Sequence, residues 1–117
     1  MQTLDDVLHR RKRLTEIEAR YYMRQILEGV KYMHEQRVIH RDLKLENFFI
    51  SDQMTVKIGD FGLAAQMSPR GRRKSICGTL NYMAPEISTS REGYSFEADV
   101  WSLGIISFLL LCGRFPF

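Results

Sequence analysis

Cysteine is scarce in this sequence, and its two cysteines are far apart. Cys77 and Cys112 form no Cys-x-x-Cys pair, and no cluster of cysteine and histidine predicts a zinc site. Few thiols without a disulfide pattern are typical of a reducing, intracellular compartment. Cys112 stands in an apolar run, so we expect its side chain in the core.

Long apolar runs are also missing. The apolar stretch 103–112 is shorter than the roughly 20 residues that a membrane-spanning helix needs. It therefore predicts a buried helix. Residues 1–6 lack the basic and apolar segments of a signal peptide. We expect a cytoplasmic protein without a membrane partner.

The charge is nearly balanced, with 17 basic and 14 acidic residues and a formal net charge of +3 at pH 7. Basic residues gather in two runs, 9–13 and 70–74, and neither run is interleaved with the aromatic residues that stack on bases. We therefore expect no nucleic-acid partner, and we interpret the first run as a solvated face. His9 and His34 are expected to be surface or helix-face residues.

Two helices can be predicted from local signals. Thr15 and Glu18 have the spacing of a capping box, and apolar residues follow at three- and four-residue steps until the pattern stops near residues 34–35. The second helix is predicted over residues 100–112, with Asp99 as its N-terminal cap.

A small β-hairpin is predicted between these helices. Residues 47–50 and 55–58 are β-like, and the polar turn 51–53 separates them. Residues 62–85 lose periodicity and predict a long loop, which is usually functional or disordered. The expected fold class is α+β, mainly α, in one domain or part of one.

Polar side chains stand before and after this hairpin. Asp42 is suited to accept or orient the proton of a substrate hydroxyl, and Lys44 to neutralise a transferred phosphoryl group. Asn47 and Asp60 offer the hard oxygen ligands that magnesium prefers, and Gly62 frees the backbone just beyond. We expect the hairpin to bring the carboxylates of Asp42 and Asp60 to opposite sides of one metal–phosphate cavity.

Four motifs carry a resemblance to protein kinases. Residues 40–47 (His-Arg-Asp-Leu-Lys-Leu-Glu-Asn) resemble the catalytic loop, and residues 60–62 (Asp-Phe-Gly) the metal-binding motif. Residues 84–86 (Ala-Pro-Glu) resemble the end of the activation segment, and residues 99–104 the start of the central buried helix. Lys44, two positions after Asp42, resembles the residue that serine/threonine kinases have at this position.

Within that class the chain most resembles polo-like kinases. The similar segments are residues 14–22, 57–64, 77–86 and 95–99. Two residues depart from the polo-like pattern. Leu80 replaces a proline, and Glu46 replaces a glycine.

The resemblance implies ATP-dependent phosphorylation of protein substrates, with ATP and Mg²⁺ as cofactors. Asp42 would be the catalytic base and Lys44 the phosphate contact. Asn47 and Asp60 would bind magnesium, and the Glu46 backbone would lie near the ATP ribose.

The resemblance also implies supporting roles. Thr79 would hydrogen-bond near Asp42 and shape the substrate groove, and Glu86 would anchor the loop to an arginine beyond Phe117. Further structural positions are His40, Phe61, Gly62 and Asp99.

Ser75 matches the activating phosphorylation position of the resembled family. It follows the basic residues 72–74 in the predicted loop. A phosphate there would add about two negative charges and would pair with Arg41, which would order the loop. An upstream activating kinase is thus an expected partner; the alternative is that Ser75 is an ordinary polar loop residue.

Some kinase features are missing from the sequence. It contains no Gly-x-Gly-x-x-Gly phosphate loop, and no lysine-bearing strand precedes residues 40–47. We expect residues 1–117 to be part of the C-terminal lobe, from the first helix after the hinge to the central helix, without the N-lobe or the last C-lobe helices. Little activity is expected from the chain alone. The alternatives are a non-catalytic remnant that binds partners and, more weakly, a basic nucleic-acid binder. Polo-like resemblance would also allow the nucleus, centrosome or spindle.

Overall fold

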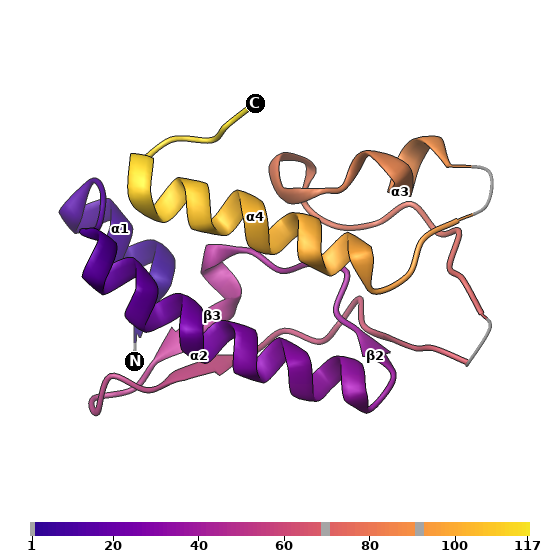
Figure 1. Cartoon of the computed structure of the whole chain (residues 1–117), viewed down its shortest axis with the longest axis horizontal. Coiled ribbons are helices and arrows are strands. Elements are labelled where there is room, and N and C mark those ends of the chain that lie inside the picture. Colours follow the sequence, from indigo (N-terminus) through magenta and orange to yellow (C-terminus); the bar gives the residue numbers. More distant parts are fainter. Residues whose placement is uncertain (1, 69–70, 91–92) are drawn as a thin grey trace.

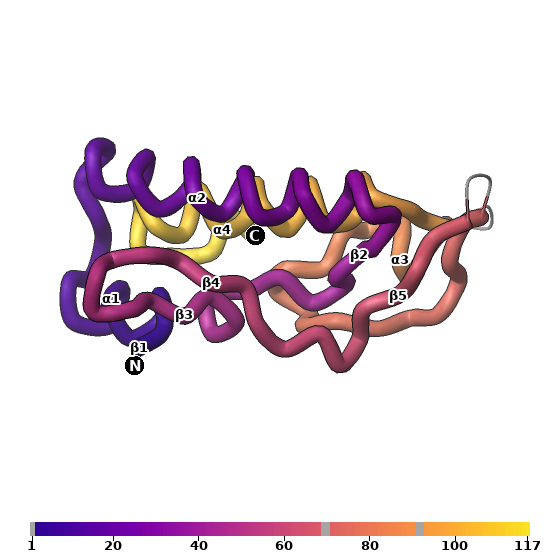
Figure 2. Tube along the Cα trace, turned by 90° about the horizontal axis from the view of Figure 1, so that it is seen from below, coloured from indigo at the N-terminus to yellow at the C-terminus, as the bar shows by residue number. Residues whose placement is uncertain are grey.

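Two long helices lie side by side, with short strands on one side of them. The computed structural model describes residues 2–68, 71–90 and 93–117. The helices are α2 (Glu16–Glu35) and α4 (Glu97–Cys112), and Figures 1 and 2 show them running alongside each other. The predicted α+β class is confirmed.

Helix α2 forms where the capping box predicted it. The Thr15 hydroxyl accepts a hydrogen bond from the Glu18 amide at 3.2 Å, and the Glu18 carboxylate accepts one from the Thr15 amide at 3.1 Å. These bonds satisfy backbone donors that the first helical turn leaves without a partner. One stripe of the helix is buried against the core and comprises Ala19, Tyr22, Ile26, Val30 and Met33.

The predicted hairpin is present as β3 (Phe48–Ile50) and β4 (Val56–Ile58). The strands are antiparallel, with Phe48 opposite Ile58, and a 3₁₀ helix at Leu45–Asn47 leads into them. Phe48 is fully buried between this hairpin and the helices.

Sequence analysis did not anticipate the N-terminal elements. Strand β1 (Gln2–Thr3) adds to β3 and makes a three-stranded sheet of order β1-β3-β4. Helix α1 (Leu4–Arg11) follows, capped by Thr3, whose hydroxyl accepts from the Asp6 amide at 3.2 Å. The basic run 9–13 lies exposed at the end of this helix.

The segment predicted as one long loop contains structure of its own. Strand β5 (Ala65–Gln66) pairs with β2 (Val38–Ile39), and a 3₁₀ helix at Leu80–Tyr82 precedes α3 (Pro85–Thr89). The prediction was wrong here because each element is only two to five residues long and is held by distant partners. Arg70, of the second basic run, lies outside the described residues.

Helix α4 is buried over most of its length and ends at Gly113, whose φ of 74° is left-handed. The core joins α1, α2, α4 and the hairpin, and its members on α4 include Leu103, Ile106 and Leu110. Cys112 is exposed in the last turn of α4, so its expected core position was wrong. Among the described helices, none is both long and apolar enough to span a bilayer.

Gly113 offers a test of the packing between α4 and the α1–α2 turn. A Cβ at this position would overlap the backbone oxygen of Lys12, and the positive φ adds strain. We expect Gly113→Ala to lower the free energy of unfolding by about 2 kcal/mol in urea denaturation. Gly104→Ala is the matched control, because a Cβ there meets no atom within 4 Å and its helical position should gain about 0.5 kcal/mol. Equal effects of the two substitutions would contradict this packing.

Candidate active site

The side chains of Asp42, Lys44 and Thr79, which come from two distant segments, meet at one place. The Thr79 hydroxyl donates to Asp42 Oδ1 at 2.6 Å, and Lys44 Nζ donates to Thr79 Oγ1 at 2.9 Å. Lys44 Nζ also lies 3.6 Å from Asp42 Oδ2. The Asp42 carboxylate, only 12% exposed, is therefore held in one orientation beside a positive charge.

Asn47 ties the same loop to the hairpin. It is almost fully buried, and its side-chain amide donates to the Asp42 backbone oxygen at 2.7 Å. Its own backbone oxygen accepts from the Gly59 amide at 2.8 Å. Asp60 follows Gly59 directly. The pairing of the two hairpin strands therefore determines how far apart the side chains of Asn47 and Asp60 lie.

Asp60 adopts a left-handed backbone conformation with φ of 52°, and its side chain is exposed. Its Oδ1 accepts a long hydrogen bond from the Gly62 amide at 3.4 Å. Aspartate tolerates this region because its short polar side chain can bond locally. A single cavity lined by both Asp42 and Asp60 stays a prediction.

Asn47 and Asp60 suit magnesium by their chemistry. Within residues 2–68, 71–90 and 93–117, no group of three or more His, Cys, Asp or Glu side chains is placed to hold a metal. Magnesium rarely needs such a cage, since it keeps several waters and binds through one or two protein oxygens plus substrate phosphates. An amide oxygen and a carboxylate therefore fit the ion.

His40 is fully buried and bridges the loop to the hairpin end. Its Nδ1 accepts from the Asp42 amide at 3.1 Å, so its Nε2 carries the proton and donates to the Gly59 oxygen at 2.9 Å. Phe61 packs on the ring with 5.0 Å between centroids, yet remains 46% exposed. The histidine thus positions the Asp42 backbone.

Asp99 has a different place from the one predicted. Helix α4 begins at Glu97, three residues earlier than expected, and the Glu97 carboxylate accepts from the Ser95 amide at 3.2 Å. Asp99 is therefore inside the first turn and is not the cap. Its side chain is 1% exposed and turns toward the loop that carries His40 and Arg41.

The Asp99 carboxylate accepts three hydrogen bonds from that side. The donors are the His40 amide at 2.9 Å, the Arg41 amide at 3.0 Å and His34 Nε2 at 2.8 Å. Of the two positions expected for His34, surface or helix face, the structure shows the second: its ring is 19% exposed on the face of α2 that bonds to Asp99 of α4. Asp99 thus connects the end of α2, the loop and α4.

The family model described as the protein kinase domain matches residues 1–117. The chain belongs to this family.

Curated relatives confirm the similarity to polo-like kinases. The chain is 57% identical to serine/threonine-protein kinase polo of Drosophila melanogaster, over 92% of the chain and 19% of that protein. It is 55% identical to the probable serine/threonine-protein kinase CCRP1 of Zea mays, over 99% and 19%. It is 51% identical to serine/threonine-protein kinase PLK2 of Mus musculus, over 99% and 17%. The chain thus spans about one-fifth of these relatives.

In this kinase-domain chain, the segment around Ser75 lies against Arg41. Ser75 is exposed, and its backbone oxygen accepts from the buried Tyr94 hydroxyl at 2.5 Å. That hydroxyl in turn accepts from Arg41 Nη1 at 3.2 Å, and Arg41 Nε donates to the Leu63 oxygen at 2.6 Å. Burial raises the pKa of Tyr94, so the hydroxyl stays a donor.

Glu86 lies on α3, which Pro85 begins as its first helical residue. Its half-buried side chain borders a groove of about 600 Å³ that also touches Trp101 and Phe117. Trp101 is 36% exposed and stacks on Phe117. The anchoring role of Glu86 stays a prediction.

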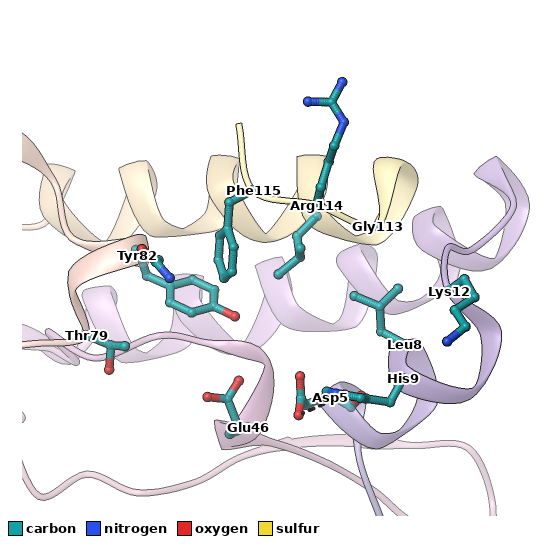
Figure 3. A pocket seen from close by; sticks show the side chains of 12 residues that line it. Asp5, Leu8, His9, Lys12, Glu46, Thr79, Tyr82, Gly113, Arg114 and Phe115 are labelled. Carbon is teal, nitrogen blue, oxygen red and sulfur yellow. Dashed lines mark hydrogen bonds and ion pairs between the residues drawn. The ribbon is translucent and has the colours of Figure 1, made fainter. Parts of the chain in front are cut away.

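Sequence analysis missed Tyr94, Tyr82 and Asp5 as site residues. Tyr94 bridges Arg41 to residue 75, while Tyr82 and Asp5 border a cavity beside Glu46 (Figure 3). The acidic pair after Thr3 was a signal for a helix start near Asp5. No local sequence pattern predicted that the two tyrosines belong to the site, because their contacts join distant segments.

The Asp99 contacts can be tested by substitution. We expect Asp99→Asn to lower the free energy of unfolding by about 2 kcal/mol, because one amide nitrogen would face donors that need an acceptor. Urea denaturation measures the loss. Asp52→Asn, in the exposed hairpin turn, removes the same charge and should change stability by less than about 0.5 kcal/mol. If the two variants were equally stable, the Asp99 contacts would not matter to the fold.

Proposed function

We propose that this chain carries phosphoryl-transfer residues of a polo-like serine/threonine kinase, which moves the γ-phosphate of ATP to hydroxyls of protein substrates. The observation that carries the proposal is the cluster of Asp42, Lys44 and Thr79, with Asn47 bonded to the same loop. Phosphoryl transfer needs mainly positioning and charge stabilisation, which this cluster supplies.

Each side chain has a role in the proposal. Asp42 accepts or orients the proton of the substrate hydroxyl, and Thr79 and Lys44 hold its carboxylate in place. Lys44 also offsets the negative charge of the transferred group. Asn47 and Asp60 hold magnesium, which when bound neutralises phosphate charge, and the Glu46 backbone lies near the ribose.

We infer also which part of a kinase domain the chain represents. Helix α1 would correspond to the first helix after the hinge and α4 to the central helix of the C-terminal lobe, and residues 40–47 between them would correspond to its catalytic loop. We expect the protein in the cytoplasm, or in the nucleus or at the centrosome or spindle.

A chimera tests the proposed activity. Residues of this chain would replace the matching segment in the Drosophila polo protein, and incorporation of labelled phosphate into casein would be measured with magnesium and ATP. We expect clear activity, and a loss of about 100-fold or more in kcat with Asp42→Asn, because the proton acceptor is removed.

The controls separate this proposal from its alternative. Asp52→Asn in the chimera should leave kcat unchanged, and the 117-residue chain alone, about one-fifth of the relative's length, should show little incorporation. A folded chimera without activity would favour a non-catalytic remnant that binds partners. Equal activity of the Asp42→Asn chimera would remove Asp42 from the mechanism.

We propose in addition that phosphorylation of Ser75 by an upstream kinase activates the enzyme. Ser75 is exposed, and Tyr94 links its backbone to the Arg41 guanidinium. A phosphate on Ser75 would give Arg41 a charge-assisted hydrogen bond in place of its neutral contact with Tyr94. The new bond would stabilise the segment that carries Thr79.

The switch is tested in the same chimera. Treatment with an activating kinase should raise kcat about tenfold, and Ser75→Ala should abolish the rise. Ser88→Ala, an exposed serine on α3, is the control. Mass spectrometry identifies the modified residue, and a full rise in the Ser75→Ala protein would contradict the switch.

A further inference from the structure

The segment before Ser75 is attached to the chain that leads into α4. The two segments, residues 72–75 and 93–97, lie next to each other at the end of the molecule opposite the N-terminus (Figure 1). The Arg73 amide donates to the Tyr94 oxygen at 2.9 Å, and the Tyr94 amide donates to the Arg73 oxygen at the same distance. This isolated antiparallel bridge holds the backbone two residues before Ser75.

Gly93 allows the two segments to come this close. Its φ of 82° is left-handed, and a Cβ on this residue would lie 2.5 Å from the Arg73 oxygen. A real Cβ does not approach a backbone oxygen so closely, so any other residue would push the segments apart or strain the backbone. The bridge therefore depends on glycine at this position.

The Arg72 side chain adds a second set of contacts. Its Nη2 donates to the Gly93 oxygen at 3.2 Å, and its guanidinium forms an ion pair with the Glu97 carboxylate. We call the Arg73–Tyr94 bridge and the Arg72–Glu97 ion pair together the clasp. It joins the segment before Ser75 to the first residue of α4.

The clasp is weak enough to open. The side chains of Arg72 and Glu97 are 43% and 51% exposed, so water and salt screen their attraction. Exposed ion pairs of this kind shift an equilibrium by about one- to fivefold. The bridge has only one residue on each side, so no longer ladder of strand hydrogen bonds supports it. We therefore expect the clasped and open forms to exchange.

The closed clasp conflicts with modification of Ser75. The Ser75 side chain is exposed, but an enzyme that acts on it would bind the residues around it as an extended peptide. An enzyme that reads the preceding arginines needs the guanidinium of Arg72, which Glu97 binds in the clasp. It also needs the backbone of Arg73, which is already hydrogen-bonded. The clasp must open before such an enzyme can bind.

We propose that the clasp is an autoinhibitory contact, which limits the rate at which an upstream kinase phosphorylates Ser75. In the closed form, Glu97 competes with the acidic groups of that kinase for Arg72. The inference rests on the Ser75 switch of the proposed function, and it adds what controls access to the switch. The rate falls in proportion to the fraction of molecules whose clasp is open. Substitutions that open the clasp therefore raise the rate.

Hydrogen exchange and trypsin measure the opening in the 117-residue chain. Exchange is followed at the amides of Arg73 and Tyr94, and mass spectrometry counts the tryptic fragments that end at residues 72–74. We expect Glu97→Gln to raise both rates about threefold, because the ion pair is lost. The glutamine keeps an oxygen that accepts from the Ser95 amide, so the start of α4 is preserved.

A second variant breaks the bridge without a change of charge. Gly93→Ala places a Cβ against the Arg73 oxygen and should raise both rates at least about tenfold. Two matched controls should leave the rates unchanged: Gly104→Ala, whose Cβ meets no atom within 4 Å, and Glu16→Gln, which removes an exposed ion pair on α2. Circular dichroism confirms folding, and Glu97→Gln decides alone if Gly93→Ala does not fold.

The effect on modification is measured with a purified protein kinase that accepts serine after Arg-Arg-x, because residues 72–75 are Arg-Arg-Lys-Ser. Mass spectrometry follows phosphate on Ser75 in the chain and in a free peptide of residues 71–80. We expect Glu97→Gln to raise the rate about threefold, toward that of the peptide, which has no clasp. Unchanged opening in Glu97→Gln would overturn the clasp. Faster opening with unchanged phosphorylation would overturn its inhibitory role.

These outcomes are separable from those of the proposed function, because the chain is the substrate in each assay and needs no activity of its own. Equal phosphorylation of wild type and Glu97→Gln would overturn the clasp even beside an active chimera. An inactive chimera would overturn the kinase activity and leave the clasp measurements standing. A chimera whose kcat does not rise on phosphorylation would overturn only the activating role of Ser75.

Discussion

The buried carboxylate of Asp99 is the contact on which the arrangement of the site depends. At residues 40 and 41 the chain leaves β2 and turns sharply, and Arg41 has a left-handed φ of 72°. The backbone amides at this turn point inward, where each needs an acceptor. Asp99 supplies both acceptors from α4. Burying a carboxylate is costly, and the third donor, His34, helps to offset that cost.

Hydrogen bonds continue from this contact to the hairpin. Asp99 fixes the His40 backbone, and the His40 ring bonds on one side to the Asp42 amide and on the other to the Gly59 oxygen. The Gly59 amide in turn bonds to the Asn47 oxygen. Residues on both sides of the hairpin are thus positioned by one buried helix. The short sheets can position these residues because the loop is bonded to α4, which is rigid.

Local sequence signals predicted the elements whose stabilisation is local. The capping box at Thr15 and the β-like runs around the 51–53 turn need only neighbours in sequence, and α2, β3 and β4 appeared as expected. The two-residue pairing of β2 with β5 has no such signal. Asp99 was misassigned for the same reason: its position next to an apolar helix resembles a cap, while its acceptors serve amides 58 and 59 residues away.

The candidate site was predictable as a set of residues, but not as a set of contacts. Asp42, Lys44 and Asn47 stand within six positions, so their proximity follows from the sequence. The contribution of Thr79 required the resemblance, and that of Tyr82 required the structure. Both belong to one short turn at the end of a long connection, and such a connection has many possible paths.

That turn joins the chemistry of Asp42 to the shape of the cavity. Thr79 bonds to the Asp42 carboxylate, and three residues later Tyr82 forms the cavity wall. The Ser102 hydroxyl of α4 donates to the Tyr82 backbone oxygen at 2.8 Å in a buried contact. Helix α4 therefore holds the turn as well as the loop. Because one helix positions both, a displacement of residues 79–82 would disturb the Asp42 carboxylate and this cavity together.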